Sequence, residues 1–395
     1  MPMTPLHRLA EHGQSVWIDY LSRELVRAGG LEHMMRDDAV VGVTSNPTIF
    51  EQAISSGSGY DGQLREALAD TRDAKEIFLQ LAARDITDAC DLLRGIYDEG
   101  VQRAAEAAAA GTGSKSGDAR RSGGVPHRDG FVSIEVDPTF AYDTEATTAE
   151  AKRLHAMIDR PNLLVKIPAT KPGLPAIEDM IAQGKSINVT LIFSLTRYEE
   201  VAQAYIRGLE RLIAAGGDPT EVASVVSFFV SRVDTETDRR LDEIGGHDSL
   251  KGKLAVANAK LAYRRYREIF AGERWEFLAS KGATTQRCLW ASTSTKNPEY
   301  SDVLYVEELV GPETVNTLPE KTIRAFQDHG RVRESLTEGV DEARELLDRL
   351  RKAGVDYDDV TATLEREGVR AFADSFTKLL DGIRGRGATA KAARG

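Results

Sequence analysis

The chain has 395 residues, of which 41% are hydrophobic and 29% charged, as in a globular protein of one large or two ordinary domains. Its net charge of −11 argues against nucleic acid or an anionic membrane as a partner, and its two cysteines, Cys90 and Cys288, argue against a disulfide framework. No apolar run reaches transmembrane length and residues 1–10 lack the apolar core of a signal peptide, so we expect a cytoplasmic protein.

Eight short apolar runs alternate with stretches in which apolar residues recur at helical spacing. The runs lie at residues 15–20, 41–48, 131–138, 163–169, 187–194, 224–231, 287–294 and 315–318. The helical stretches are residues 21–35, 74–110, 148–158, 196–215, 254–270 and 340–350. Eight strands joined by helices predict an α/β fold of the (β/α)8 TIM-barrel type. An open, doubly wound sheet is the alternative, because periodicity does not determine topology.

The predicted domain organisation is a single barrel over residues 1–383, with two segments outside its plan. Residues 111–124 (GTGSKSGDARRSGG) are rich in glycine, serine and charge, which predicts a flexible insertion near 111–127. Residues 384–395 are basic and rich in small side chains, which predicts a disordered tail.

The fourth apolar run, LLVKIPA at 163–169, carries a lysine, Lys166, among apolar residues. Lysine is almost never fully buried unless a partner or a reaction requires it. Burial favours the neutral form of an amine, and this is the form that attacks a carbonyl to make a Schiff base. The alternative for this run alone is a lysine at a strand end whose ammonium reaches water.

Five of the runs place polar or charged side chains on one face and apolar side chains on the other, because side chains alternate along a strand. The polar set consists of Asp19, Asn46, Glu135, Lys166, Asn188 and Thr190. In a barrel only the C-terminal mouth has room for so many polar groups, and barrel active sites lie there. Each residue alone is more often structural, but a lysine grouped with two carboxylates predicts a proton-transfer site.

The sixth and seventh runs lead into hydroxyls and a cation. Ser227 and Arg232 come from the sixth, and Ser292, Ser294 and Lys296 follow the seventh. Arginine can bind a phosphate through two parallel hydrogen bonds, and loops after the late strands of a barrel commonly bind phosphate. These segments predict a phosphate site, the alternative being surface cations beside polar turns. The seven histidines form no H-x-H or H-E-x-x-H pair, so no metal site is expected.

Six segments, taken together and in this order, resemble the transaldolase family, most closely its longer bacterial branch. They are GVTSNPTIF (42–50), SIEVDPTFAYDT (133–144), LLVKIPAT (163–170), INVTLIFS (187–194), SFFVSRVD (227–234) and WASTSTKNPEYSD (290–302). The resemblance implies a class I aldolase-like barrel with extra helices, and a transferase that needs no cofactor.

The activity implied by the resemblance belongs to the non-oxidative branch of the pentose phosphate pathway. A dihydroxyacetone unit would move from sedoheptulose 7-phosphate to glyceraldehyde 3-phosphate, giving erythrose 4-phosphate and fructose 6-phosphate. Phosphorylated sugars are the expected partners, and nucleic acid and membrane are not. We expect a monomer or a homodimer.

The resemblance also implies roles for the polar residues. The catalytic set comprises the Schiff-base nucleophile Lys166, the acid/base Glu135, the residues Asn46 and Thr190 that help to hold its water, and the proton-transfer partner Asp19. The substrate-binding set comprises the enamine-orienting Asn188 and the phosphate ligands Ser227, Arg232, Ser292, Ser294 and Lys296.

One turn departs from the family pattern, and two rival functions remain. Family members carry an Ala-Ser-aromatic-Arg turn where this chain has ASTSTK (291–296), so Lys296 would replace the arginine. The first rival is a lyase resembling fructose 6-phosphate aldolase, but such enzymes are shorter and carry glutamine in place of Glu135. The second is a non-enzymatic barrel that binds sugar phosphates, which would not need Lys166, Glu135 and Asp19 together.

Overall fold

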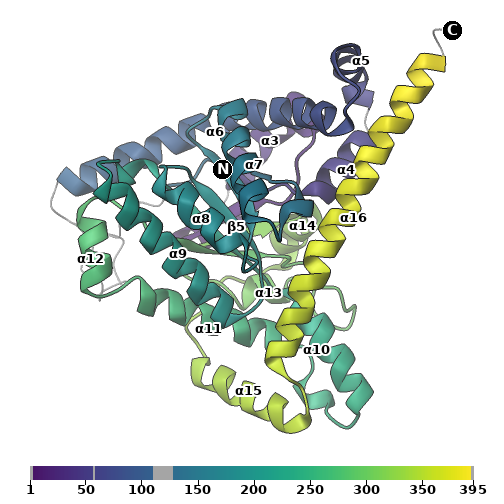
Figure 1. Cartoon of the computed structure of the whole chain (residues 1–395). Helices are drawn as coiled ribbons and strands as arrows, with labels where there is room; N and C mark the ends of the chain where they lie inside the picture. Colours follow the sequence, from purple (N-terminus) through teal and green to yellow (C-terminus); the bar gives the residue numbers. More distant parts are fainter. Residues whose placement is uncertain (1–2, 57, 110–127, 393–395) are drawn as a thin grey trace.

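The eight apolar runs form the eight parallel strands of a closed barrel in the computed structural model, which describes residues 3–56, 58–109 and 128–392 (Figure 1). The strands are β1 (Gln14–Ile18), β2 (Val40–Val43), β3 (Phe131–Glu135), β4 (Leu163–Pro168), β5 (Ile187–Ile192), β6 (Ser224–Phe229), β7 (Arg287–Ala291) and β8 (Thr314–Leu318). They pair in chain order, and β8 closes the barrel on β1. The predicted (β/α)8 barrel is confirmed and the open sheet is excluded.

Seven of the eight strands end one to five residues before the predicted runs do. The second run was expected over 41–48, but β2 ends at Val43 and the polar residues after it lie in a loop. The loop leads directly into α4, which begins at Pro47. Polar residues at the ends of the runs therefore lie in loops at the barrel mouth instead of in the sheet.

Helices surround the barrel, and the first eight in chain order lie before β5. They are α1 (Pro5–Glu11), α2 (Arg23–Arg27), α3 (Gly30–Asp37), α4 (Pro47–Ser56), α5 (Asp61–Asp70), α6 (Ala74–Ala109), α7 (Thr144–Ile158) and α8 (Gly173–Ala182). The helices after β5 are α9 (Leu195–Ala214), α10 (Ser231–Ile244), α11 (Leu254–Ile269), α12 (Glu273–Ser280), α13 (Leu304–Glu307), α14 (Glu320–His329), α15 (Val340–Ala353) and α16 (Tyr357–Ala392). No helix within the described ranges is long and apolar enough to cross a membrane.

Residues 21–35 were expected to form one helix, and the structure divides them into α2 and α3. The break lies at Gly29, which has a φ of 76° and stands at the start of α3. Glycine adopts this left-handed conformation without the steric cost that a Cβ brings. The spacing of apolar residues correctly predicted helical structure here. It did not show that Gly29 divides the segment into two helices.

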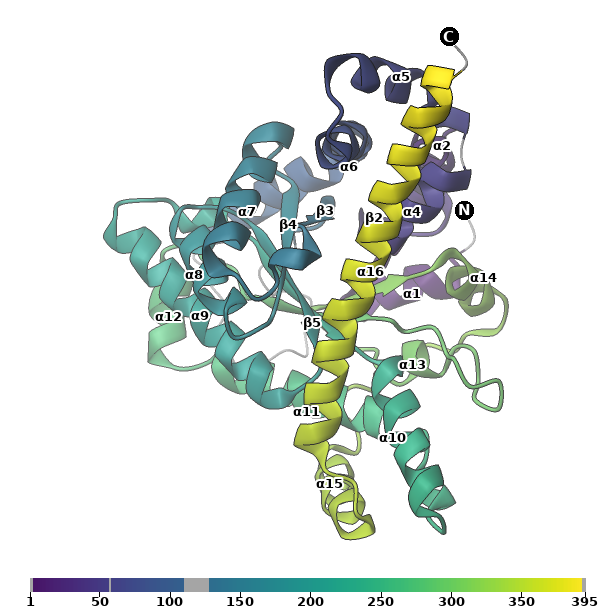
Figure 2. The ribbon, with the colours of Figure 1, turned by 45° about the vertical axis from the view of Figure 1, so that its right-hand side comes forward.

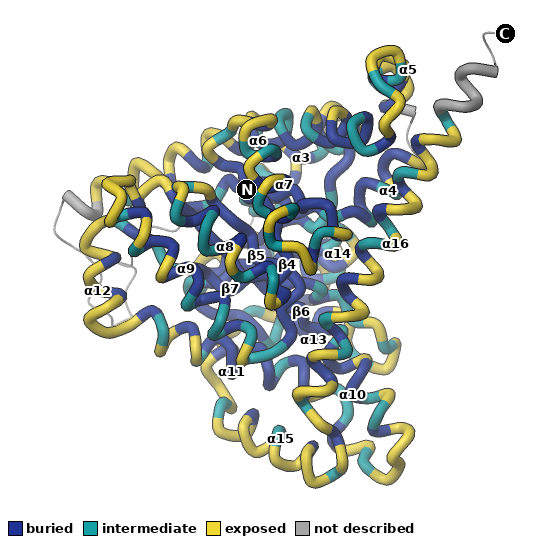
Figure 3. The backbone as a smooth tube through the Cα atoms, in the orientation of Figure 1, coloured by how far each residue is buried: buried dark blue, intermediate teal, exposed yellow. Residues whose placement is uncertain are grey.

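Every strand residue except Val41 of β2 is buried (Figure 3). The outward side chains pack on the helices, and the inward ones fill the barrel. At the amino end of the barrel an ion pair joins Arg287 to Asp129, with 2.9 Å between Nη2 and Oδ1. Ser15 and the indole of Trp17 also donate hydrogen bonds to the Asp129 carboxylate. The Asp129 carboxylate at this end of the barrel is therefore bonded by other side chains of the protein.

The last helix, α16, crosses the barrel diagonally from α15 to α5 (Figure 2). Its buried face carries Phe372, Phe376, Leu379 and Ile383, which recur at three- and four-residue intervals. The disordered tail predicted over 384–395 is wrong for 384–392, because α16 continues to Ala392 and Arg386 contacts Asp61 and the carbonyl of Ile54. The insertion predicted near 111–127 lies outside the described residues.

Candidate active site

Lys166 lies inside the barrel, and its partner is a carboxylate on the neighbouring strand. Glu135, the last residue of β3, pairs in register with Lys166 of β4. The Lys166 Nζ lies 3.3 Å from Oε2 of Glu135, and both side chains are at least 95% buried. Nζ also donates a 3.1 Å hydrogen bond to the carbonyl of Ser45, in the loop after β2. The alternative of a lysine that reaches water is therefore wrong.

The environment of Glu135 favours its protonated form. Burial raises the pKa of Glu135 to about 7, although the nearby positive charge of Lys166 lowers it. Neither Glu135 oxygen, nor the buried hydroxyl of Thr190 on β5, hydrogen-bonds to another described residue. A carboxyl group that titrates near neutrality can give and take a proton at the pH of the cell.

Asp19 follows β1 and lies half-buried at the same mouth. Thr44 donates a 2.8 Å hydrogen bond to its carboxylate, and the Thr44 hydroxyl also lies 2.7 Å from that of Thr317. Burial raises the pKa of Asp19, while the positive charge of Lys166 and the bond from Thr44 lower it. The strand ends therefore bring a second carboxylate within electrostatic reach of the lysine.

The side chain of Asn46 caps helix α4, whatever part it takes in catalysis. Its side-chain oxygen accepts a 3.0 Å hydrogen bond from the backbone N–H of Ile49, so it caps the first turn of α4. The side chain is half-buried at the mouth.

Asn188 lies beside Lys166, because these two residues pair in register between β5 and β4. Its amide donates to the hydroxyl of Ser133 at 3.1 Å and accepts from the hydroxyl of Ser227 at 2.7 Å. Ser227 was predicted to bind phosphate together with Arg232. In the structure its hydroxyl bonds Asn188 on the neighbouring strand β5, and its role as a phosphate ligand stays a prediction.

The other predicted phosphate ligands gather where β6 and β7 end. Lys296 donates a 2.7 Å hydrogen bond to Ser294, and the Ser292 hydroxyl lies 3.0 Å from that of Ser231, which the sequence had not singled out. Burial and the nearby charge of Arg232 both lower the pKa of Lys296. The Arg232 guanidinium lies 5.6 Å from the ring centroid of Phe229 and has no hydrogen-bond or ion-pair partner among the described residues. Two neighbouring cations with few acidic partners suit an anion.

An aromatic ring from α16 covers the lysine. The centre of the Phe372 ring lies 5.9 Å from Nζ of Lys166, and the residue is 4% exposed. The sequence analysis did not assign Phe372 to the site, because the place where α16 packs depends on contacts with distant segments.

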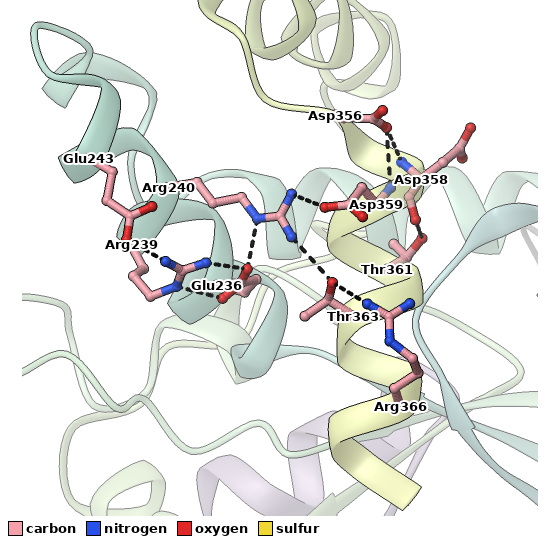
Figure 4. A network of polar contacts seen from close by, with 10 residues as sticks. All are labelled: Glu236, Arg239, Arg240, Glu243, Asp356, Asp358, Asp359, Thr361, Thr363 and Arg366. Atoms are coloured by element: carbon pink, nitrogen blue, oxygen red, sulfur yellow. Dashed lines mark hydrogen bonds and ion pairs between the residues drawn. The ribbon is translucent and has the colours of Figure 1, made fainter.

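Polar contacts join α16 to α10, the helix that begins beside Arg232. Arg240 of α10 donates hydrogen bonds to Asp359 at 2.6 Å and to Thr363 at 3.4 Å, both on α16 (Figure 4). Farther along α16, Ser375 accepts a 2.9 Å hydrogen bond from Thr48 of α4. The helix that covers the mouth is therefore tied to elements on both of its sides.

No group of three or more His, Cys, Asp or Glu residues in the described ranges is placed to hold a metal ion. The described residues of the site offer a buried amine, two carboxyl groups with raised pKa values, and two neighbouring cations. This combination suits covalent and acid/base chemistry on a carbonyl compound that carries an anionic group.

Comparison with known proteins identifies the family. Residues 16–383 match the family described as Transaldolase/Fructose-6-phosphate aldolase. Proteins named Transaldolase from Frankia alni and Parafrankia sp. are 49% and 51% identical to this chain, over 96% of it and over 96% and 97% of their own lengths. A third, from Acidothermus cellulolyticus, is 51% identical over 95% of both chains. The predicted family and the expectation of a transferase enzyme are confirmed, and the chain belongs to the transaldolase/fructose-6-phosphate aldolase family.

Proposed function

We propose that this chain is a transaldolase that moves a dihydroxyacetone unit between phosphorylated sugars through a Schiff base on Lys166. The donor would be sedoheptulose 7-phosphate and the acceptor glyceraldehyde 3-phosphate, giving erythrose 4-phosphate and fructose 6-phosphate in the pentose phosphate pathway. The observation that carries the proposal is the buried pair of Lys166 and Glu135, with 3.3 Å between the amine and the carboxyl oxygen.

The first stage forms the imine. The neutral amine of Lys166 adds to the keto carbon of the donor, and an amine proton passes to the keto oxygen to give a carbinolamine. A second proton then lets this hydroxyl leave as water and gives the iminium. A group that titrates near pH 7 is needed to deliver and remove these protons, and the pKa of Glu135 is about 7. The hydroxyl of Thr190, which has no described partner, is available to hold a water between Glu135 and the substrate.

The second stage breaks and remakes a carbon–carbon bond. The C3–C4 bond of the donor breaks, its electron pair moves toward the iminium nitrogen to give an enamine, and Asp19 takes the proton of the C4 hydroxyl. The aldehyde product leaves and the acceptor aldehyde replaces it. The enamine carbon then attacks the acceptor, whose oxygen recovers the proton from Asp19. Asn188 would orient the enamine beside Lys166.

Arg232 and Lys296, with the hydroxyls of Ser292 and Ser294, would bind the phosphate of donor and acceptor. Removing one charge-assisted contact weakens binding by roughly ten- to a hundredfold. Arg232→Ala is therefore expected to raise KM for fructose 6-phosphate by that factor and KM for fructose, which has no phosphate, much less. Steady-state kinetics with both donors checks this, and equal changes in the two KM values would contradict a phosphate contact.

Borohydride reduction in the presence of fructose 6-phosphate tests the Schiff base directly. The expected result is a dihydroxyacetone adduct on the peptide that contains Lys166, found by mass spectrometry, and the absence of an adduct would contradict the proposal. Adding erythrose 4-phosphate separates transfer from simple cleavage, since a lyase would release dihydroxyacetone instead of forming sedoheptulose 7-phosphate. A cytoplasmic location, independence of cofactors and a monomeric or homodimeric state remain predictions of the same proposal.

A further inference from the structure

The ring of Phe372, on α16, lies beside the Lys166 amine. Its centre lies 5.9 Å from the Lys166 amine. A second ring, that of Phe229 at the end of β6, has its centre 6.5 Å from the centre of the Phe372 ring. Phe372 is 4% exposed and Phe229 is 7% exposed. Two neighbouring, buried aromatic rings therefore lie close to the lysine.

The helix that carries Phe372 lies unusually close to the sheet at this point. Gly368 stands one turn before Phe372, and a Cβ built there would lie 3.0 Å from the side chain of Leu191 on β5 and 3.6 Å from the ring of Phe193. Such contacts are at or below the normal limit for carbon atoms, so a glycine at this position allows the close approach. No layer of water fits between α16 and the end of β5 here.

The contacts on each side of Phe372 hold the helix in place. Arg240 binds Asp359 and Thr363 before the ring, and Thr48 binds Ser375 just after it. One turn farther on, Phe376 packs edge-on against Phe78, with 5.5 Å between the ring centres. Phe372 is therefore part of a fixed cover over the pocket.

In the proposed reaction the enamine on Lys166 has two possible fates. In transfer, its carbon bonds to an aldehyde carbon and the aldehyde oxygen takes the proton from Asp19. In release, its carbon takes a proton from water, the resulting iminium adds a water molecule, and the C–N bond breaks to give dihydroxyacetone and the free amine. Both fates end in hydrolysis of an iminium by one water, but release also needs a proton from water at the enamine carbon, where transfer places the aldehyde carbon instead.

We propose that Phe372 is a specificity-determining residue that keeps water from the enamine and so makes the enzyme transfer its dihydroxyacetone unit instead of releasing it. The ring lies 5.9 Å from Nζ, on the side of the amine that faces α16, and so leaves less room there for a water that could protonate the enamine carbon. Exclusion of water from a closed site is a recognised way to prevent hydrolysis of a reactive intermediate. This inference rests on the proposed Schiff-base transfer and adds to it the group that decides between transfer and release.

The test measures the ratio of released dihydroxyacetone to transferred product, with fructose 6-phosphate as donor and erythrose 4-phosphate as acceptor. Phe372→Ala is expected to raise this ratio by about tenfold or more, because it opens the pocket to water. Phe372→Leu, which keeps an apolar side chain in place, is expected to stay within about threefold of the unchanged enzyme. Phe376→Ala is the matched control, since it removes the same ring from the same helix at the same 4% exposure but packs on Phe78.

A rise in the ratio for Phe372→Ala alone supports the inference. An unchanged ratio in Phe372→Ala, or an equal rise in Phe376→Ala, would overturn it, because the effect would then be absent or would come from loosening of α16. An equal rise in Phe372→Leu would also overturn it, since the ring's attraction for the iminium charge would then be the cause. If Phe372→Ala does not fold, Phe372→Val takes its place with an intermediate rise expected, and an unchanged ratio there would equally overturn the inference.

The outcome remains separable from that of the proposed function. If the unchanged enzyme gives no borohydride adduct and no transfer, the Schiff-base proposal fails before the ratio can be defined. If it transfers normally and the Phe372 variants keep its ratio, only the role of Phe372 fails.

Discussion

Two buried ion pairs lie at opposite ends of the same barrel, and the groups around them differ. At the amino end, Asp129 receives hydrogen bonds from Arg287, Ser15 and Trp17. Arg287 also donates to Ser15 and to the carbonyl of Arg128, each at 2.9 Å. At the mouth, Glu135 has Lys166 at 3.3 Å and neither of its oxygens has a hydrogen bond from another described residue.

The pKa directions of the two carboxyl groups follow from this difference. Burial by itself would raise both, but at Asp129 the charge of Arg287 and the three sets of hydrogen bonds outweigh burial and lower the pKa. At Glu135 burial outweighs Lys166 and raises the pKa to about 7. A fully bonded pair holds a fixed charge and contributes to structure, whereas an incompletely bonded pair has a proton that can move.

The comparison predicts the largest effect for Lys166→Arg. The guanidinium keeps the charge but cannot act as a neutral nucleophile, so turnover should fall by at least about a thousandfold while the protein folds. Coupled assays of transfer check this. Lys260→Arg is the matched control, because Lys260 is also buried and ion-paired, to Glu308 at 3.4 Å, but lies in α11, and its activity should be unchanged. Substantial turnover in Lys166→Arg would remove the lysine from the reaction.

At the other end of the barrel, Asp129→Asn should affect stability and not chemistry. Removing one partner of a buried pair leaves the other uncompensated and costs ~3–5 kcal/mol of unfolding free energy. Chemical denaturation measures this loss, and kcat below the transition should stay close to that of the unchanged protein. The control is Asp91→Asn, which breaks an exposed pair with Arg160 and should cost no more than about 1 kcal/mol. Equal losses in the two variants would contradict a structural role for the amino-end pair.

Glu135→Gln should show the reverse pattern, with a large loss of turnover and a small change in stability. The amide keeps the shape of the side chain but cannot carry the proton, so kcat should fall by about 10²- to 10⁴-fold. The same denaturation experiment should show that the variant folds normally at pH 7. Activity within threefold of the unchanged enzyme would assign the proton transfers to another group.

The smallest predicted effect is in how stability depends on pH, and it has opposite signs for the two carboxyl groups. Because the folded-state pKa of Glu135 is raised from 4.5 to about 7, its contribution is fully present below pH 4.5 and is lost as pH rises toward 7. Because the pKa of Asp129 is lowered, its contribution is present above its ordinary value of 3.8 and is lost as pH falls below it.

Unfolding titrations between pH 4 and 8 check these signs. The unfolding free energy of Glu135→Gln should fall less between pH 4.5 and 7 than that of the unchanged protein, by up to about 3 kcal/mol. Identical pH profiles for the two proteins would mean that Glu135 does not titrate in this window. A matched profile for Asp129→Asn in the same window is expected, since that carboxyl group is ionised throughout it.

The sequence alone predicted the elements with strong periodic signals. Eight apolar runs became eight strands because alternation and β-branched residues act locally, and the parity of Glu135, Lys166 and Asn188 placed them on the inner face before any pairing was known. The mouth of a parallel barrel collects the carboxyl ends of all strands, so polar residues at those ends meet without further information.

Contacts between distant segments were decided only by the tertiary structure. The Ser227 hydroxyl bonds Asn188, and Phe372 covers a lysine 206 positions earlier in the chain. Helix α16 extends beyond the expected boundary at 383, and Arg386 there contacts Asp61 and the carbonyl of Ile54. The composition of a segment and its spacing determine what it can form by itself. Which surface a helix covers, and which of two carboxyl groups keeps a mobile proton, depends on neighbours that only folding brings together.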